Sequence, residues 1–492
     1  MDDTSKQTSL SGFSTGSISS LSQLLGKSPI ESLIAGYGLP LHIYFTEEVR
    51  RAASKFRAAA DRLYPNCDIL FAVKSNPCRG AIRTAHHFGC GADVVSEFEL
   101  RAALEEGINP LCIVCNGNAK SDEYIKLAVA SGTYIAADSR EELRLISAET
   151  TKQRRTTRVL LRLSGMALDG LTAPEQSTAA SWTKFGEPVS CAEEFYNLAE
   201  SLPGVQPVGF SAHIGTQICD VRGYELLAEI LVDITRRFVK AGCRLEALDF
   251  GGGYPLAYLG EEEWKDLTAR LRRQLRGESK PGEAVTFGES AMGYGWIKER
   301  PPSDDDPYRG KAYWSEAPGE RMLERLLSCR IEGRKTIAEE LKELGEPRLF
   351  IEPGRGLFGP AGVTLAKISG VKSVEGNTLV IADIGIVNHG TVLVTPDVYP
   401  FMVWPPREDD HPVEVFIGGR LCFTGDMISK IKIPLNRLPK RGELLVVGLT
   451  GAYCADHFAS NSCGFPRPAK IAVKADGDIE VWRPAETYRS IA

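Results

Sequence analysis

Residues 69–77 read Ile-Leu-Phe-Ala-Val-Lys-Ser-Asn-Pro, a short apolar run that ends on a lysine. Five consecutive apolar residues predict a buried strand, and Asn76-Pro77 end it just past Lys74. An ammonium group at the mouth of such a strand is costly unless it is exposed, paired or used covalently. Such a site lowers the pKa of the amine, as an imine-forming lysine requires. The alternative is an ordinary lysine that points to water.

Short apolar runs alternate with helical patterns on both sides of this stretch, from Leu41 to about Pro360. Strands are expected at 92–95, 111–114, 134–136, 159–163, 208–212, 247–250 and 348–351, and helices at 79–88, 97–106, 122–131, 140–149, 223–240 and 321–344. Repeated βα units predict a parallel sheet, and so many of them favour a closed (β/α)8 barrel of the TIM type. After Pro360, strands follow without long helices, which predicts an all-β domain.

Domain boundaries follow from these changes in pattern. The expected parts are a flexible tail (1–27), a segment that joins the β domain (28–45), the barrel (46–360) and the C-terminal β domain (361–492). The tail is rich in Ser, Thr and Gly and lacks the cationic start and apolar core of a secretion signal. Residues 276–318 are rich in Gly, Pro and charge, so we expect an insertion in a βα connection that is partly disordered or a lid.

Composition narrows the range of partners. The net charge is −6 and no long basic run occurs, which argues against nucleic acid or an anionic membrane as the main partner. No apolar stretch is long enough to span a bilayer. The 12 cysteines are scattered, as is typical of a reducing compartment such as the cytoplasm. Cys112 and Cys115 form a CxxC without a second pair, so we expect buried strand cysteines and no metal site, with a metal or redox role as the alternative.

Three motifs follow expected strands, where a barrel builds its active site. Residues 249–255 read DFGGGYP, and three glycines let backbone N–H groups approach an anion; the alternative is a tight turn. Residues 351–356 read IEPGRG, in which Arg355 suits a phosphate and Glu352 suits a heterocyclic nitrogen or a salt bridge to Arg355. Residues 211–217 read SAHIGTQ and place His213 at a strand end, as a catalyst or as a packed ring.

The motifs FAVKSNP, HIGTQ, DFGGGYP, EPGRG and the late GAY follow one another in this order along the chain. The chain thereby resembles the fold-type III PLP-dependent decarboxylases, which include the diaminopimelate, ornithine and biosynthetic arginine enzymes, with alanine racemase a more distant relative. The resemblance spans about Leu39 to Arg483. It implies a PLP-dependent carboxy-lyase that acts on an amino-acid substrate and works as a homodimer.

The resemblance also implies a role for each motif residue. Lys74 would hold pyridoxal 5'-phosphate (PLP) as an aldimine, His213 would stack on the pyridine ring, and Glu352 would pair with the ring nitrogen. The phosphate would be held by Thr216, Gly252, Gly253, Gly354, Arg355 and Tyr453. Further family positions near the cofactor are matched by Asp93, Glu99 and Arg162.

Two residues bear on the type of reaction. Cys422 would come from the β domain of the partner subunit and return a proton to the carbanion at Cα; the alternative is a small buried thiol. Glu352 keeps the pyridine nitrogen protonated, which makes the ring a strong electron sink, whereas in the racemase branch an arginine faces that nitrogen. The acid therefore favours decarboxylation over a racemase or epimerase. A non-catalytic regulator is a further alternative, but such homologues tend to lose cofactor residues that are present here.

The chain departs from the family directly after Cys422. Ornithine, arginine and diaminopimelate decarboxylases carry an acid there that helps to bind the distal end of the substrate, whereas this chain has Phe423. Asp426 is expected to be structural, and His389 to contact substrate or to lie in a surface loop. Family members of siderophore and antibiotic pathways also lack the acid and take conjugates or carrier-bound substrates. We therefore expect an amino acid or amino-acid-derived conjugate as substrate, in polyamine or siderophore biosynthesis.

Overall fold

The computed structural model of this chain describes residues 15–26, 28–166, 177–280, 282–288, 313–331, 335–390 and 398–491. The chain divides into two compact units. The first, called the barrel unit, comprises Thr46–Leu256 and Ser315–Gly359. The second, called the β unit, comprises Met1–Phe45, Ala257–Trp314 and Pro360–Ala492.

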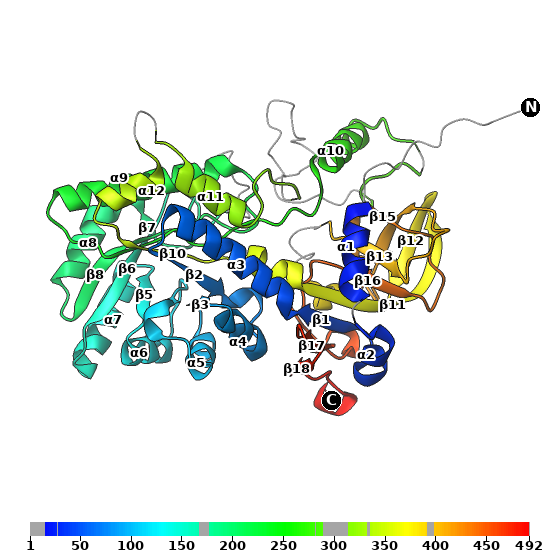
Figure 1. The fold of residues 1–492 in the computed structure, drawn as a ribbon, viewed down its shortest axis with the longest axis horizontal. Helices are drawn as coiled ribbons and strands as arrows, with labels where there is room; N and C mark the ends of the chain where they lie inside the picture. Colours follow the sequence, from blue (N-terminus) through cyan, green and yellow to red (C-terminus); the bar gives the residue numbers. More distant parts are fainter. Residues whose placement is uncertain are drawn as a thin grey trace, which may run out of the picture. The chain divides into compact units, whose positions relative to one another are not determined.

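Eight parallel strands of the barrel unit close on themselves within the described residues (Figure 1). They are, in order around the barrel, β2 (Cys67–Ala72), β3 (Gly91–Val94), β4 (Ile113–Cys115), β5 (Tyr134–Ala137), β6 (Thr157–Ser164), β8 (Val205–Ser211), β9 (Ala247–Asp249) and β10 (Arg348–Ile351), which pairs with β2 again. This closure confirms the predicted (β/α)8 barrel. Because the strands are parallel, their carboxyl ends meet at one end of the barrel.

The helices of the barrel unit surround these strands (Figure 1). They are α3 (Thr46–Leu63), α4 (Arg79–His87), α5 (Glu97–Glu105), α6 (Asp122–Ser131), α7 (Arg140–Gln153), α8 (Ala192–Ser201), α9 (Val221–Lys240), α11 (Glu320–Ser328), α12 (Ile337–Glu343) and the short α13 (Arg355–Phe358). The prediction of one helix over 321–344 is wrong, because α11 and α12 are separate. Thr336 and Glu339 form a capping box, and this pair of reciprocal hydrogen bonds starts α12 as a new helix.

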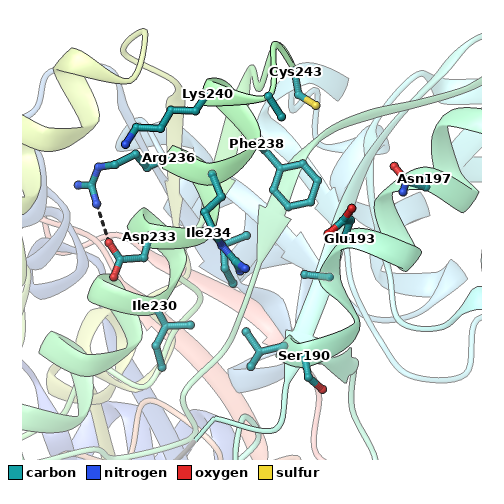
Figure 2. Close-up of a pocket in the computed structure, with 14 residues that line it drawn as sticks. Ser190, Glu193, Asn197, Ile230, Asp233, Ile234, Arg236, Phe238, Lys240 and Cys243 are labelled. Carbon is teal, nitrogen blue, oxygen red and sulfur yellow. Dashed lines mark hydrogen bonds and ion pairs between the residues drawn. The ribbon is translucent and has the colours of Figure 1, made fainter.

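A groove of about 750 Å3 lies between α8 and α9. Figure 2 shows Glu193 and Asn197 on one wall and Asp233, Arg236 and Lys240 on the other. Within it, the guanidinium of Arg236 donates a 2.6 Å hydrogen bond to the carboxylate of Asp233. None of the motif residues predicted from the sequence lines this groove, so the candidate site lies elsewhere in the unit.

Apolar side chains fill the interior of the barrel. The buried cluster consists of Leu70, Val114, Tyr134, Ala136, Leu160, Val208, Ala247 and Phe350, which come from seven of the strands. Side chains alternate along a strand, so the residue two places further on faces the same interior, one layer nearer the carboxyl end. In this way the core residues fix which side chains face inward at the mouth of the barrel.

The β unit is built on a second sheet. Its strands are β1 (Leu41–Phe45), β11 (Gly362–Val374), β12 (Asn377–Ala382), β13 (Phe401–Trp404), β14 (Val413–Gly418), β15 (Met427–Leu435), β16 (Leu444–Val447), β17 (Ala469–Val473) and β18 (Ile479–Arg483). The order is β15-β14-β12-β11-β1-β17-β18, and β16 pairs with β11 and β13. The N-terminal strand β1 therefore lies between two strands that follow residue 360. None of the described helices in either unit is both long and apolar enough for a bilayer crossing.

Part of the segment predicted as a flexible tail is helical. Residues Thr15–Leu25 form α1, and Leu21 and Leu25 are buried in a cluster with Met402 and Val446. Leucines at 21, 24 and 25 share one face of a helix, and this short apolar stripe is hidden among serines in the sequence. Residues 1–14 of the predicted tail lie outside the described residues.

Residues 282–288 of the predicted insertion at 276–318 pack on the β unit, whereas residues 315–318 group with the barrel unit. The backbone N–H of Phe287 donates to the carbonyl of Lys430 in β15 (2.8 Å), and the Phe287 ring lies 5.5 Å from that of Phe416. The preceding helix α10 (Glu261–Leu275) also belongs to this unit, because Arg270 forms an ion pair with Glu414 (2.6 Å). The segment that groups with the β unit thus begins at Ala257, earlier than predicted. Residues 289–312 lie outside the described residues.

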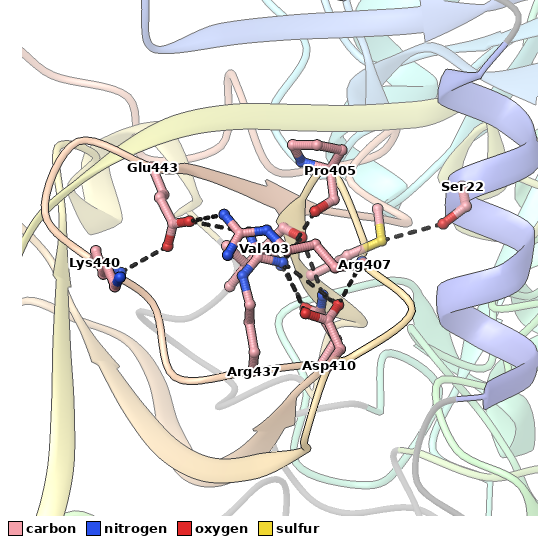
Figure 3. A network of polar contacts seen from close by, with 10 residues as sticks. Ser22, Val403, Pro405, Arg407, Asp410, Arg437, Lys440 and Glu443 are labelled. Atoms are coloured by element: carbon pink, nitrogen blue, oxygen red, sulfur yellow. Dashed lines mark hydrogen bonds and ion pairs between the residues drawn. The ribbon is translucent and has the colours of Figure 1, made fainter.

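A buried arginine joins two connections of the β unit, β13–β14 and β15–β16 (Figure 3). Arg437 Nη1 donates to the carbonyls of Val403 (3.2 Å) and Pro405 (3.0 Å), and its Nη2 donates to Glu443 (3.1 Å). Asp410 completes the set as an ion-pair partner at 3.3 Å. Five donors on one planar group can satisfy several backbone carbonyls that end a strand, which fixes the connections around β13.

His42 on β1 makes the β unit sensitive to acid. Its ring is buried, Nδ1 lies 2.9 Å from the hydroxyl of Thr364, and burial together with Arg483 and Lys470 lowers its pKa to about 3. An unfolded histidine titrates near 6.5, so below that pH the unfolded chain binds a proton that folded His42 does not. The free energy of unfolding should therefore fall as the pH drops from 6.5 towards 3.

We expect His42→Gln to reduce that acid-induced loss of stability by about 2–3 kcal/mol between roughly pH 6.5 and 4.5. The measurement is urea unfolding of both proteins across this pH range. His411→Gln is the matched control, since His411 is an exposed histidine of the same unit. Parallel pH profiles for wild type and His42→Gln would show that His42 does not couple folding to protons.

Candidate active site

The register of the barrel places one polar side chain at the carboxyl end of each strand. Cross-strand partners such as Ala72 and Asp93, Arg162 and Ser211, and Ser211 and Asp249 share a face of the sheet, and that face is the barrel interior. The resulting ring consists of Lys74, Asp93, Asn116, Asp138, Arg162, Ser211, Asp249 and Glu352. Seven of these eight residues are buried, and Lys74 is the exception.

Five members of this ring form a continuous chain of hydrogen bonds. The Nζ of Lys74 donates to Asp93 Oδ2 at 2.5 Å. The amide nitrogen of Asn116 donates both to Asp93 Oδ1 (2.9 Å) and to Glu352 Oε1 (2.6 Å). Glu352 in turn shares a hydrogen bond with Asp249. One amine and three carboxylates from four strand ends are thereby held in one network.

Burial sets the protonation of this network. It raises the pKa of Glu352 well above its usual range, and the charges of Asp249 and Asp93 add to the effect. Burial likewise raises the pKa of Asp249 to about 6. The Asp249–Glu352 pair therefore retains a proton at a pH where exposed carboxyl groups are ionised. The Lys74 side chain remains 32% exposed while that of Asp93 is fully covered, so the amine is open to a reagent and its counterion is not.

His213 lies beside the glycine-rich loop that follows β9. Burial, Lys74 and Arg162 lower the pKa of His213 well below 6.5, so its ring is neutral. A Cβ added to Gly252 would lie 2.4 Å from the carbonyl oxygen of Glu352 and 3.0 Å from His213 Nε2. Only glycine permits this approach, and the loop passes directly between the histidine and the EPGR segment.

The remaining barrel residues predicted from motifs gather at the same end. Gly253 packs against the 213–218 loop that carries Thr216, because its backbone carbonyl accepts from Ile218 N at 3.0 Å. Gly354 precedes α13, and Arg355, at the first position of that helix, is buried. The guanidinium of Arg162 lies 3.6 Å from Asp138 and stacks 4.4 Å from the ring of Phe185.

This set of residues fits PLP. A pyridine aldehyde that carries a phosphate needs a reachable amine, an acid for its ring nitrogen, a flat group for its face and donors for its phosphate. The accessible Lys74, the protonated Glu352 pair and the neutral His213 ring meet the first three needs. The loop at Gly252, which a Cβ would obstruct, and the guanidinium of Arg355 meet the fourth.

The β unit holds the other predicted site residues in three connected segments. Arg420 N donates to the carbonyl of Ile384 (3.1 Å), and Gly390 N donates to that of Cys454 (2.9 Å). The segments joined in this way are 384–390, 419–426 and 451–457, which carry His389, Cys422, Phe423 and Tyr453. Cys422 is exposed, and Phe423 is 50% exposed despite its apolar ring.

The carboxylate of Asp426 joins two of these segments, 384–390 and 419–426. Its carboxylate accepts from the backbone N–H groups of Ile386 (2.8 Å) and Leu421 (2.6 Å), in agreement with the structural role expected for it. His389 is fully buried and packs edge-on against Tyr399, so the alternative of a surface loop histidine is wrong. The backbone turns at Gly390, where a Cβ would collide with the carbonyl of His457 at 1.5 Å, and this draws His389 inside. Its predicted contact with substrate stays a prediction.

Comparison with known proteins places the chain. Residues 47–286 match the family described as pyridoxal-dependent decarboxylase, pyridoxal binding domain. The chain belongs to the fold-type III PLP-dependent decarboxylases. The diaminopimelate decarboxylase of Archaeoglobus fulgidus is 27% identical to this decarboxylase over 93% of both chains, and that of Methanothermobacter thermautotrophicus is 27% identical over 95% of this chain and 94% of its own.

Solved structures share the fold of this decarboxylase. Diaminopimelate decarboxylase from M. jannaschii, solved with L-lysine, has a TM-score of 0.74 at 22% identity and covers 94% of this chain and 92% of its own. Lysine/ornithine decarboxylase from Vibrio vulnificus, solved with putrescine, has a TM-score of 0.64 at 20% identity, with 94% of this chain and 99% of its own covered. At these identities the likeness concerns the fold alone.

Sequence reasoning missed several residues of the candidate site. They are Asn116, Asp138, Ser211 and Asp249, each at or just past a strand end. The usable signal is position, because each lies two or three residues after an inward-facing core residue of the same strand. Glu99, which was matched to the family, lies on α5 and accepts from Val95 N (2.8 Å); burial raises its pKa to about 7.

Proposed function

We propose that this decarboxylase removes the α-carboxylate of an amino acid or amino-acid-derived conjugate, with Lys74 holding PLP covalently and Cys422 returning the proton to Cα. The observation that carries the proposal is the hydrogen-bond chain from Lys74 through Asp93 and Asn116 to Glu352. It places a reachable amine and a proton-retaining acid in one buried network at the barrel mouth. When bound, PLP supplies a ring that accepts the electron pair left as CO2 departs.

Glu352 directs the reaction towards decarboxylation. Its carboxylate would face the ring nitrogen of bound PLP, and an opposite charge favours the protonated form of that nitrogen. Asp249 shares the proton of Glu352, so the pair can donate a hydrogen bond before the cofactor is charged. His213 is neutral, and it would lie against the ring face without adding a charge that would compete with the ring. A racemase would gain from a weaker sink, which this acid does not provide.

The phosphate is assigned to donors from the barrel loops. Gly252, Gly253 and Gly354 offer backbone N–H groups at positions where a Cβ would crowd neighbouring protein atoms, and Arg355 offers a planar pair of charged donors. Thr216 adds a hydroxyl from the loop after β8. Tyr453 of the β unit is assigned to the same phosphate, and its left-handed φ of 62° turns the short GAY segment sharply.

Cys422 is proposed as the acid that protonates Cα, in a homodimer in which it serves the partner's barrel. Its thiol is exposed on the β unit and is held in a loop that Asp426 braces. A general acid must reach the carbon within hydrogen-bonding range at the moment of transfer, and an exposed thiol on a braced loop suits that task. A cytoplasmic location, consistent with twelve free cysteines, is part of the same proposal.

Phe423 affects which distal group of a substrate the site can bind. The relatives compared above are named diaminopimelate decarboxylases. The resemblance to this family implies an acid directly after the cysteine. Here the phenyl ring at this position is half exposed and cannot accept a hydrogen bond from an ammonium group. We therefore propose a substrate whose distal end carries no free ammonium, such as an acyl or citryl conjugate of a diamino acid.

CO2 release tests the substrate proposal. The wild-type holoenzyme should turn over the conjugates and show little activity on meso-diaminopimelate, ornithine and lysine. Phe423→Glu should raise kcat/KM for the free diamino acids by about 10- to 100-fold, since a hydrogen bond to a charged group is worth about 1.5–3 kcal/mol. Phe423→Leu, which changes size but adds no acceptor, is the control. Rapid wild-type turnover of meso-diaminopimelate would overturn the proposal and leave diaminopimelate as the substrate.

A further inference from the structure

A neutral amide lies between two buried carboxylates in the network at the barrel mouth. Asn116 directly follows β4, is only 7% exposed, and is fixed by its backbone N–H, which donates to the carbonyl of Val94 at 2.8 Å. Its two amide hydrogens are both used, one on Asp93 and one on Glu352. No motif of the sequence contains this residue, and the function proposed above uses it only as a link in the hydrogen-bond chain from Lys74 to Glu352.

The charges around Asn116 show what the amide does. Asp93, Asp249 and Glu352 are three buried carboxylates, and Lys74 is the cation that donates to one of them. Two carboxylates repel each other at short range in a buried site, and each needs donors to stay ionised. The amide supplies a donor to two of them at once without a charge of its own, so it does not compete with Lys74 for its counterion.

The two hydrogen-bond partners of Asn116 are assigned to opposite ends of the PLP ring. Asp93 holds the amine that would bind the aldehyde, and Glu352 is the acid assigned to the ring nitrogen. The amide therefore fixes the separation between the anchor of the cofactor and the group that sets its charge. A change at Asn116 would therefore affect both ends of the PLP ring, because it would displace Asp93, which holds Lys74, and Glu352, which is assigned to the ring nitrogen.

We propose that Asn116 is a positioning residue for PLP, which orients Asp93 against Lys74 and keeps Glu352 able to carry a negative charge opposite the ring nitrogen. This inference rests on the proposed function, because it assigns PLP to these residues. A purely structural brace would contribute to the stability of the fold and leave cofactor binding and cofactor protonation unchanged.

Two variants of nearly the same size as asparagine separate these roles. Asn116→Leu removes both donors, and Asn116→Asp replaces a donor by a fourth carboxylate. Asn118 supplies the matched controls Asn118→Leu and Asn118→Asp, since it lies two residues away in the same loop and is exposed. For each protein we would measure the dissociation constant of PLP, the pH midpoint of the visible absorption change of the holoenzyme, and the thermal midpoint of the apoenzyme.

We expect Asn116→Leu to weaken PLP binding by about 10- to 100-fold, because each of two buried carboxylates loses a donor. Asn116→Asp should weaken it further, and both variants should move the pH midpoint of the absorption change by at least about one unit. The Asn118 variants should match wild type. The affinity of Asn116→Ser for PLP should lie between those of wild type and Asn116→Leu, because serine keeps one hydroxyl donor. This variant replaces Asn116→Leu in the test if the leucine variant does not fold.

The outcomes distinguish this inference from the proposed function. If wild type binds PLP and the Asn116 variants lose only thermal stability, with unchanged dissociation constant and pH midpoint, Asn116 is a structural brace and the inference is overturned. If wild type itself fails to bind PLP, the proposed function falls, and the inference falls with it. Weakened binding in the Asn116 variants together with a shifted pH midpoint supports it.

Discussion

Lys74→Ala is expected to lower CO2 release by at least about 10^3-fold and to abolish the visible absorption of the holoenzyme. Lys74 lies just past β2 in a 3-10 turn, with its Nζ on Asp93 and a third of its side chain open to solvent. Among the ring residues of the barrel mouth it supplies the only amine, since the others are carboxylates, amides, hydroxyls or a guanidinium. Without it, PLP loses its covalent attachment and the substrate loses the amine it must displace.

Lys74→Arg separates this covalent role from the ion pair with Asp93. A guanidinium retains the positive charge but remains protonated and does not form the required bond with an aldehyde. We expect the arginine variant to fold like wild type and to be as inactive as the alanine variant. Lys126→Ala, an exposed lysine on α6, should leave activity unchanged. Substantial turnover by Lys74→Arg would contradict a covalent role.

Cys422→Ala should lower kcat by about 10^2- to 10^4-fold while PLP binds within about twofold of wild type. We expect kcat to fall without a change in PLP binding, because the barrel residues assigned to the cofactor are intact and only the donor of the proton to Cα is lost. Cys463→Ala is the matched control, since Cys463 is a second exposed thiol of the same unit. Product analysis should show an altered course of protonation at Cα rather than a loss of substrate binding.

A mixing experiment tests whether Cys422 acts across subunits. Lys74→Ala and Cys422→Ala are each inactive by prediction, but a mixed dimer would contain one barrel with both intact groups. Random reassortment should restore about a quarter of wild-type activity, because half of the dimers are mixed and each has one complete site. No recovery after proven subunit exchange would place Cys422 in its own subunit's site or outside the chemistry.

The sequence predicts much of the barrel because its elements are locally encoded. Each strand is a short apolar run closed by turn formers, and helices such as α5, α6 and α7 begin at capping serines. Motif residues such as Lys74, His213 and Glu352 come directly after such runs, so their place at the barrel mouth follows from the fold alone. The closure of the strands confirms this part of the prediction.

Other features depend on contacts between distant segments and escape prediction. Asn116 acquires its role only when β4 lies beside β3 and three strands from β10, which brings Asp93 and Glu352 within reach of one amide. Helix α1 forms where Leu21 and Leu25 find Met402 and Val446, and its serines hide that stripe in the sequence. His389 is buried because the turn at Gly390 packs under the 451–457 segment.

The most direct measurement is to locate the covalent attachment itself. The holoenzyme would be reduced with borohydride, digested, and searched by mass spectrometry for a phosphopyridoxyl group. The structure predicts that label on the peptide with Lys74 and on no other lysine, with buried and ion-paired Lys120 and Lys470 unmodified. A label on another lysine, or a reduced protein without one, would contradict the account.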